Sequence, residues 1–224
     1  MEKKIYLVWA IMACFVMNAS AQFSNSGGNS TTVSDNFGWN TVYVEWNPSN
    51  ANIPKNNDFF WDNDVDGKYN GFSLGYSRTI SLTQSLPIFL EVGLAGQFSH
   101  KTWENDDNHH KLSAISIKVP INVLYKFDIP NRPVSLIPFA GLTVRGNVWV
   151  QYKENDGNYN VFDKEDMEEK EGNTGKRVQI GWQIGLKARF AEKYIIGSSY
   201  GSDFNEIFND LKARTGTVMV GYIF

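Results

Sequence analysis

The chain has 224 residues, which is enough for one domain with a leader. Its 21 Lys and Arg nearly balance its 24 Asp and Glu, and the formal net charge of −3 excludes the strongly basic surface that nucleic acid selects. After the leader, no segment approaches the roughly 20 consecutive apolar residues that a membrane helix requires.

Residues 1–21 have the parts of a cleaved secretory signal peptide. Two lysines near the start are followed by the apolar run 5–17 and by small residues that end at Ala21. We expect cleavage between Ala21 and Gln22, and export of the mature chain. A lipoprotein signal around Cys14 is the alternative, but the apolar run continues past that residue. Because Cys14 is the one cysteine of the chain, the mature protein would have no thiol or disulfide.

Residues 22–38 are rich in Ser, Asn, Gly and Thr, which predicts a flexible periplasmic lead-in. From residue 39 to residue 224, apolar and polar residues alternate, and this period of two is typical of β-strands. In residues 177–190, Val, Ile, Trp, Leu, Ala and Phe occupy one parity, and Gln, Gly, Lys and Arg occupy the other. We expect eight strands, at residues 39–47, 69–80, 88–99, 112–126, 134–151, 177–190, 194–201 and 217–224.

The two faces of these strands predict an all-β protein, an eight-stranded antiparallel transmembrane β-barrel over residues 39–224. One face carries large apolar residues, whereas the other is mostly Gly, Ser, Thr, Gln and Asn. This arrangement suits a lipid-facing wall around a narrow polar interior, and a soluble barrel would reverse it. Eight strands leave an interior that side chains fill, so we expect a plugged lumen. The charged residues expected to face inward are Glu91, Lys118, Lys126, Arg145, Lys187 and Arg189.

Loop lengths predict how the barrel is oriented, because outer-membrane barrels alternate short periplasmic turns with longer outer loops. The expected outer loops are 48–68, 100–111, 152–176 and 202–213, and the expected periplasmic turns are 81–87, 127–133 and 191–193. Pro120 and Pro138 fall inside strands, where each removes a backbone donor, so we expect β-bulges there. Aromatic residues near the strand ends fit two interfacial girdles.

The C-terminal sequence Val218–Phe224 resembles the signal by which the barrel-assembly machinery recognises outer-membrane proteins. Tyr222 and Phe224 match that signal, whereas Met219 stands where it has a glycine. This resemblance implies that the assembly machinery is a partner during biogenesis.

Three internal segments resemble the PorT-like outer-membrane β-barrel family of Bacteroidetes. They are Gly71–Arg78, Ile117–Asn122 and Pro138–Leu142, and the resemblance covers residues 39–224. It implies a barrel in the outer membrane. Many members of that family have no defined activity, and a role in protein secretion is implied for a founding member alone.

The sharpest local motif is a run of alternating carboxylates at Asp62, Asp64 and Asp66, followed by Gly67. Such a run begins an EF-hand-type calcium loop, but the position of the final bidentate Glu holds Ser73. A weak calcium site and a solvated acidic loop are the two interpretations. No other cofactor is expected. The acidic run 163–171 is interpreted as a solvated charged segment.

The sequence favours a structural or interaction role in the outer membrane, with no evident catalytic activity. Its partners would be outer-membrane lipids and another envelope protein, which would bind the apolar clusters of the outer loops. One alternative is a lipid-A-modifying enzyme, for which the adjacent Ser99 and His100 are the nearest nucleophile and base. A narrow channel and a soluble barrel that binds a small ligand are further alternatives.

Overall fold

The computed structural model describes residues 38–52, 68–83, 85–105, 108–155, 157–165, 175–206 and 212–224. The expected cleavage site at Ala21 and Gln22, and the carboxylates of Asp62, Asp64 and Asp66, lie outside these residues. No helix in the described part of the chain is long and apolar enough to cross a membrane.

Eight long strands and two short ones make up the fold. The long strands are β1 (Trp39–Asn52), β2 (Lys68–Ser81), β3 (Ile88–Asn105), β4 (Asn108–Tyr125), β6 (Val134–Glu154), β8 (Val178–Phe190), β9 (Tyr194–Asp203) and β10 (Lys212–Ile223). The short strands are β5 (Phe127–Asp128) and β7 (Gly157–Asn160), and both pair with β6. Strands of alternating β-branched, aromatic and small polar residues suit a sheet with two different faces.

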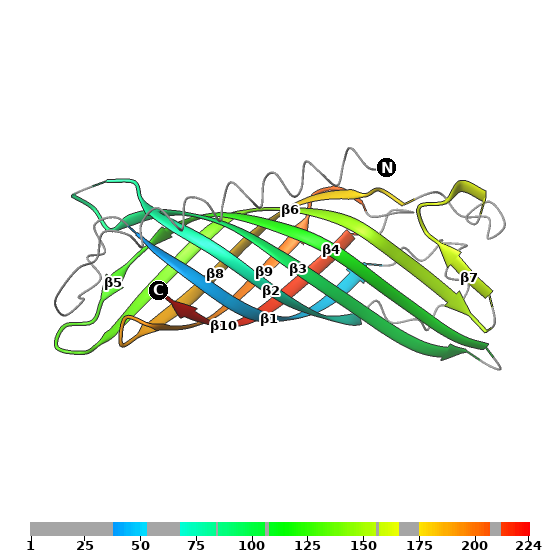
Figure 1. The fold of residues 1–224 in the computed structure, drawn as a ribbon, viewed down its shortest axis with the longest axis horizontal. Coiled ribbons are helices and arrows are strands. Elements are labelled where there is room, and N and C mark those ends of the chain that lie inside the picture. Colours follow the sequence, from blue (N-terminus) through cyan, green and yellow to red (C-terminus); the bar gives the residue numbers. More distant parts are fainter. Residues whose placement is uncertain are drawn as a thin grey trace. The chain divides into compact units, whose positions relative to one another are not determined.

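The long strands close into a barrel. Their order in the sheet is β4-β3-β2-β1-β10-β9-β8-β6, and β4 also pairs with β6, so every long strand has two antiparallel neighbours (Figure 1). A row of cross-strand partners that starts at Trp149 of β6 runs round the barrel and returns to β6 at Pro138. This stagger is typical of strands tilted by roughly 40° to the barrel axis. The predicted eight-stranded antiparallel barrel is confirmed.

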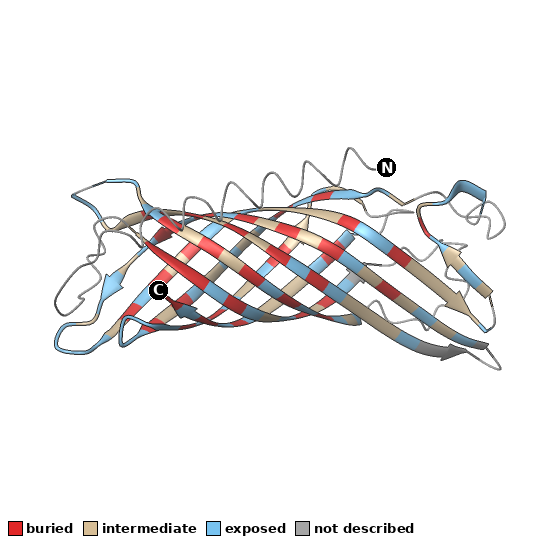
Figure 2. Cartoon of the chain, viewed as in Figure 1, coloured by how far each residue is buried: buried red, intermediate tan, exposed pale blue. Residues whose placement is uncertain are grey.

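The barrel has its apolar residues outside and its polar residues inside. Leu74, Ile184 and Val220 are 65%, 56% and 57% exposed, whereas Gln179 and Lys187 are 0% and 5% exposed. Buried residues alternate with more exposed ones along most of β2, β8 and β10 (Figure 2). An exterior of large apolar side chains would be unfavourable in water, so this surface fits lipid. The alternative of a soluble barrel is therefore wrong.

Neither proline produces the bulge that the sequence predicts. Pro120 lies between two stretches of β3–β4 pairing, Val92 with Ile121 and Ala95 with Lys118, that share one register. The predicted bulge at Pro120 is wrong, because a missing donor interrupts the ladder without requiring an extra residue.

Pro138 of β6 interrupts the ladder in the same way. It lies opposite the gap between β4 and β5, which both pair with this side of β6. Leu124 pairs with Phe139, and Phe127 pairs with Leu136, so the register continues across the gap. The one register shift between β4 and β6 in the described chain lies at Val148, far from either proline.

The two ends of the barrel differ, and β5 and β7 mark them in Figure 1. The short-turn end carries the connections 82–87, 126–133 and 191–193, and the long-loop end carries 53–67, 106–107, 155–177 and 204–211. The predicted outer loop 100–111 is wrong, because β3 and β4 continue as a hairpin in which Asn105 pairs with Asn108. This hairpin lacks apolar alternation, so the sequence pattern gave no sign of it. The turn after β8 places Ala191 and Glu192 at positive φ, as a two-residue type I′ hairpin turn requires.

An apolar cluster fills the lumen toward the short-turn end. Trp39 and Phe89 pack with ring centroids 4.9 Å apart, and both are nearly inaccessible to solvent. The other members are Tyr43, Ala95, Leu124, Ile137, Phe139, Ile195, Met219 and Ile223. The lumen is therefore less polar than the sequence predicts, since inward positions of several strands hold large apolar residues.

Candidate functional site

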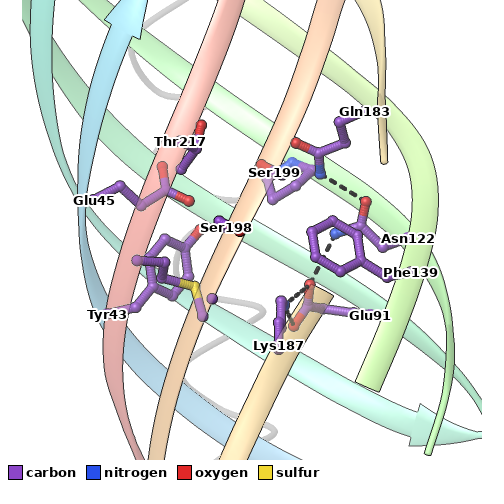
Figure 3. Close-up of a pocket in the computed structure, with 13 residues that line it drawn as sticks. Tyr43, Glu45, Glu91, Asn122, Phe139, Gln183, Lys187, Ser198, Ser199 and Thr217 are labelled. Carbon is purple, nitrogen blue, oxygen red and sulfur yellow. Dashed lines mark hydrogen bonds and ion pairs between the residues drawn. The ribbon is translucent and has the colours of Figure 1, made fainter. Parts of the chain in front are cut away.

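The lumen contains an ion pair between Glu91 of β3 and Lys187 of β8. The Lys187 ammonium lies 2.7 Å from each carboxylate oxygen of Glu91, and the two residues are 5% and 3% exposed. Asn122 and Ser77 also donate hydrogen bonds to this carboxylate, over 2.8 Å and 3.3 Å. Gln183 in turn donates to Asn122 over 2.7 Å, and Figure 3 shows this chain of contacts across the lumen. Such partners are what a buried charge requires.

Two more ion pairs lie in the lumen. Lys118 pairs with Glu45, and Arg145 pairs with Asp203, and each of these side chains is at most 12% exposed. The inward basic residues were predicted from sequence, but their acidic partners were not. Glu45 lies on a strand whose alternation is weak, and Asp203 falls in the segment that was predicted to be a loop. With these acids included, each of the three basic residues in the lumen has its positive charge neutralised by an acidic partner.

Another predicted interior residue, Arg189, lies at the apolar cluster. Its guanidinium carbon is 5.1 Å from the Trp39 ring centroid, and its Nε donates to the Glu192 carbonyl over 3.3 Å. Lys126 lies outside the lumen network, at the short-turn end, where it pairs with Asp128 over 3.0 Å.

Neutral polar side chains complete the filling. Ser116 donates to Asn147 over 2.7 Å, and Asn147 donates to Gln179. Nearer β1, Asn47 donates to Ser73 over 2.7 Å and accepts from Thr217. These bonds cross between strands and leave most inward polar groups satisfied.

Two small cavities that are lined by described residues lie between these layers. One has a volume of about 20 Å³ and is lined by Glu45, Glu91 and Lys187 among others, as Figure 3 shows. The other has a volume of about 40 Å³ and includes Lys118 and Arg145 in its lining. A single water occupies at least about 10–15 Å³ on this scale, so each cavity holds only one or a few water molecules. The Glu45–Lys118 pair lies between the cavities, with one partner in each lining.

The predicted nucleophile and base are not partners. His100 instead lies 3.1 Å, Nδ1 to Oγ, from Ser113, its cross-strand neighbour on β4. The sequence could not show this pair because thirteen residues separate its members. A Ser–His contact is one element of a hydrolytic site. Acyl transfer also needs donors aimed at the developing oxyanion, and the backbone amides of β3 and β4 at this point belong to paired strands.

No group of three or more His, Cys, Asp or Glu that could hold a metal ion occurs within the described ranges. His110, which directly follows His109 in the sequence, has its Nδ1 2.8 Å from the Tyr152 hydroxyl, within hydrogen-bond distance. The calcium candidate at residues 62–66 lies outside the described chain.

The C-terminal aromatic residues face outward at the short-turn end. Phe224 is 43% exposed, and its backbone amide donates to the Asn40 carbonyl over 3.1 Å. Tyr222 is also 43% exposed and contacts the ring of Tyr194, with centroids 5.8 Å apart. Both residues that match the assembly signal are thus presented on the exterior of the last strand.

The chain is similar to several proteins of known structure. One of them is Ail, the attachment invasion locus protein of Yersinia pestis, in complex with the heparin analogue sucrose octasulfate. The match covers 84% of this chain and 99% of the Ail chain, at 14% sequence identity and a TM-score of 0.46. Neisserial surface protein A (NspA) matches at 14% identity and a TM-score of 0.43, over 82% of this chain and 95% of that one. The outer membrane enzyme PagL matches at 12% identity and a TM-score of 0.44, over 80% and 97%.

No curated protein matches the chain. A family described as the outer membrane protein beta-barrel domain matches residues 7–224. This match spans nearly the whole sequence, and it agrees with the closed barrel and its apolar exterior. The chain therefore belongs to the outer membrane protein beta-barrel domain family.

Proposed function

We propose that this outer-membrane barrel has a structural or interaction role that it performs through its long-loop end. The observation that carries the proposal is the filled lumen, in which three ion pairs and an apolar cluster occupy the described part of the interior, and the cavities of about 20 and 40 Å³ between them hold only one or a few water molecules each. A barrel without a solute path acts through its surface. Pull-down of the tagged barrel from solubilised outer membranes, with a variant lacking loop residues 53–67 as control, tests this role. If the wild type and the variant co-purified the same proteins, an interaction role of residues 53–67 would be contradicted.

The proposed orientation places the short-turn end in the periplasm and the long-loop end outside the cell. Short periplasmic turns and longer outer loops are the usual arrangement in such barrels. Residues 1–21 would direct export and be removed by cleavage between Ala21 and Gln22, which leaves residues 22–38 as a periplasmic lead-in. N-terminal sequencing of the protein from outer membranes tests the cleavage site, and a mature chain that starts elsewhere would contradict it.

A narrow channel is the function that the lumen argues against. Planar-bilayer recordings should show no steps above the baseline of protein-free membranes. Discrete conductance steps that vanish in an unfolded control would overturn the proposal that the lumen is filled and carries no solute.

The segments Gly71–Arg78, Ile117–Asn122 and Pro138–Leu142 support membership of the PorT-like barrels of Bacteroidetes. The match of Tyr222 and Phe224 to the assembly signal supports recognition by the barrel-assembly machinery. Deletion of Phe224 should reduce the heat-modifiable, folded fraction in cells.

Calcium binding by Asp62, Asp64 and Asp66 is proposed as weak, and isothermal titration with Asp64→Asn as control tests it.

A lipid-modifying enzyme is the second candidate, and the contact between His100 and Ser113 favours it. Ser113 would be the nucleophile and His100 the base. Incubation of the folded barrel with lipid A, followed by mass spectrometry, should release acyl chains in the wild type and none in Ser113→Ala. Intact lipid A in both samples would exclude this activity.

A further inference from the structure

Three successive rows of residues on the outward face of β4 and β6 change from apolar to polar to cationic toward the long-loop end. The first row pairs Ile115 with Trp149, which are 46% and 37% exposed. The second row pairs Ser113 with Gln151. The third row pairs Lys111 with Lys153. No register shift intervenes, so all three rows lie on one face of the sheet.

Lys111 and Lys153 are direct cross-strand neighbours of the same charge. Side chains in this relation have Cβ atoms about 4.5–5.5 Å apart, and like charges placed so are destabilising. Neither lysine makes an ion pair with another residue of the described chain. The next neighbours in the row, Thr102 and Asn158, are uncharged. Within the described part of the chain, the row therefore carries two positive charges that no acidic side chain balances.

The depth of this row matches the level of lipid phosphates. Two rows correspond to four residues, or about 13 Å along a strand. At a tilt of roughly 40°, the lysines then lie about 10 Å farther out along the barrel axis than Ile115 and Trp149. A hydrocarbon core that ends near the Trp149 ring would place the polar headgroup region at the lysines.

The opposite side of the barrel repeats this order of residue types. On β10, exposed Val218 is followed outward by Gly216 and then by Arg214, and Arg214 faces Asn50 of β1. In two separate parts of the exterior, cations without an ion-pair partner among the described residues thus lie two rows beyond the apolar wall. This repetition indicates that the positive charges interact with the headgroup region of the surrounding membrane.

We propose that Lys111 and Lys153 together bind the phosphate group of an anionic lipid in the outer leaflet. A phosphate between the two ammonium groups would remove their repulsion, and Gln151, which is partly exposed, would face the uncharged part of the same headgroup, whereas Ser113 is only 7% exposed. The site rests on the proposed orientation, which puts the long-loop end in the outer leaflet, and it deepens the surface role proposed above.

The test compares the wild type with the double variant Lys111→Gln/Lys153→Gln, both folded in an uncharged sugar detergent. The probe is bisphosphorylated lipid A, with dephosphorylated lipid A as the second ligand. The variant Arg132→Gln/Lys193→Gln removes two exposed cations at the short-turn end and serves as the matched control. Heat-modifiable gel mobility first establishes that all three barrels are folded, which separates this test from that of the barrel itself.

We expect the double variant to lose roughly thirtyfold in affinity for bisphosphorylated lipid A, about fivefold for each lysine. Its affinity for the dephosphorylated lipid should be unchanged, and so should the control variant's affinity for either lipid. Equal affinities of wild type and double variant would overturn the proposal, as would an equal loss in the control. Displacement of the lipid by millimolar inorganic phosphate would also overturn it, because the site would then recognise free phosphate.

Discussion

Replacement of Lys187 by Met should destabilise the barrel strongly, because it leaves the Glu91 carboxylate buried without its cation. Both residues are at least 95% buried, and the ammonium contacts both carboxylate oxygens at 2.7 Å. Methionine has a similar length and no charge, so the change removes the ion pair with little loss of packing volume.

The expected cost follows from the groups that remain around the carboxylate. Removal of one partner of a buried ion pair costs about 3–5 kcal/mol. Asn122 and Ser77 still donate to Glu91, which places the expected loss for Lys187→Met at the lower end, about 3 kcal/mol. The double variant Glu91→Gln/Lys187→Met has no buried charge at this point, so it should lie within about 1 kcal/mol of the wild type.

The free energy of unfolding is measured by urea titration of the barrel in lipid vesicles, with gel mobility to separate folded from unfolded chains. Lys176→Gln is the matched control, because this lysine pairs with Glu206 and the two side chains are 60% and 35% exposed. Such a surface pair contributes about 0–1 kcal/mol. A loss below about 1 kcal/mol in Lys187→Met, or a double variant as unstable as the single one, would refute the reasoning on buried charge compensation.

Four further substitutions, one of them a control, test the packing and a surface carboxylate. Gly141→Ala should cost about 1–3 kcal/mol, because a Cβ there would overlap a backbone carbonyl oxygen of β4, whereas Gly96→Ala meets nothing within 4 Å and should be neutral in the same urea titration. Trp39→Ala should cost about 3–5 kcal/mol by opening the apolar cluster, and a loss under about 1 kcal/mol would show that the cluster does not stabilise the barrel. Partial burial raises the pKa of Asp128, but hydrogen bonds from Ser135 and the neighbouring lysine outweigh it and hold that pKa below its usual range. A lowered pKa in the folded state stabilises the fold above the unfolded pKa, so Asp128→Asn should be slightly destabilising at pH 7, and the difference should vanish as pH falls through the folded pKa. A difference that is independent of pH would contradict this role of Asp128.

The barrel was predictable from sequence because lipid outside and a narrow polar lumen impose one strict alternation on every strand. β8 shows this most clearly, since Ile180, Trp182 and Ile184 are all exposed while Gln179 is fully buried. Strand boundaries were less predictable where the chain leaves the membrane. The hairpin of β3 and β4 has polar residues on both faces there, so its pairing to residue 105 has no periodic signal.

The pairing inside the lumen was not predictable. Glu91 and Lys187 are 96 residues apart and lie on strands that are not neighbours in the sheet. Whether they meet depends on the stagger of the whole barrel, which the sequence of a single strand does not contain. The contact of His100 with Ser113 depends in the same way on the register between two strands.

The central claim is that the chain forms a closed barrel whose apolar face lies in the lipid of the outer membrane. Spin labels at single cysteines along β8, introduced in a Cys14→Ala background and reconstituted in vesicles, test it most directly. Labels at Ile180 and Ile184 should be accessible to oxygen dissolved in lipid, and labels at Gln179 and Lys187 should be accessible neither to oxygen nor to a water-soluble nickel complex. Access of the nickel complex to the labels at Ile180 and Ile184 would contradict the account.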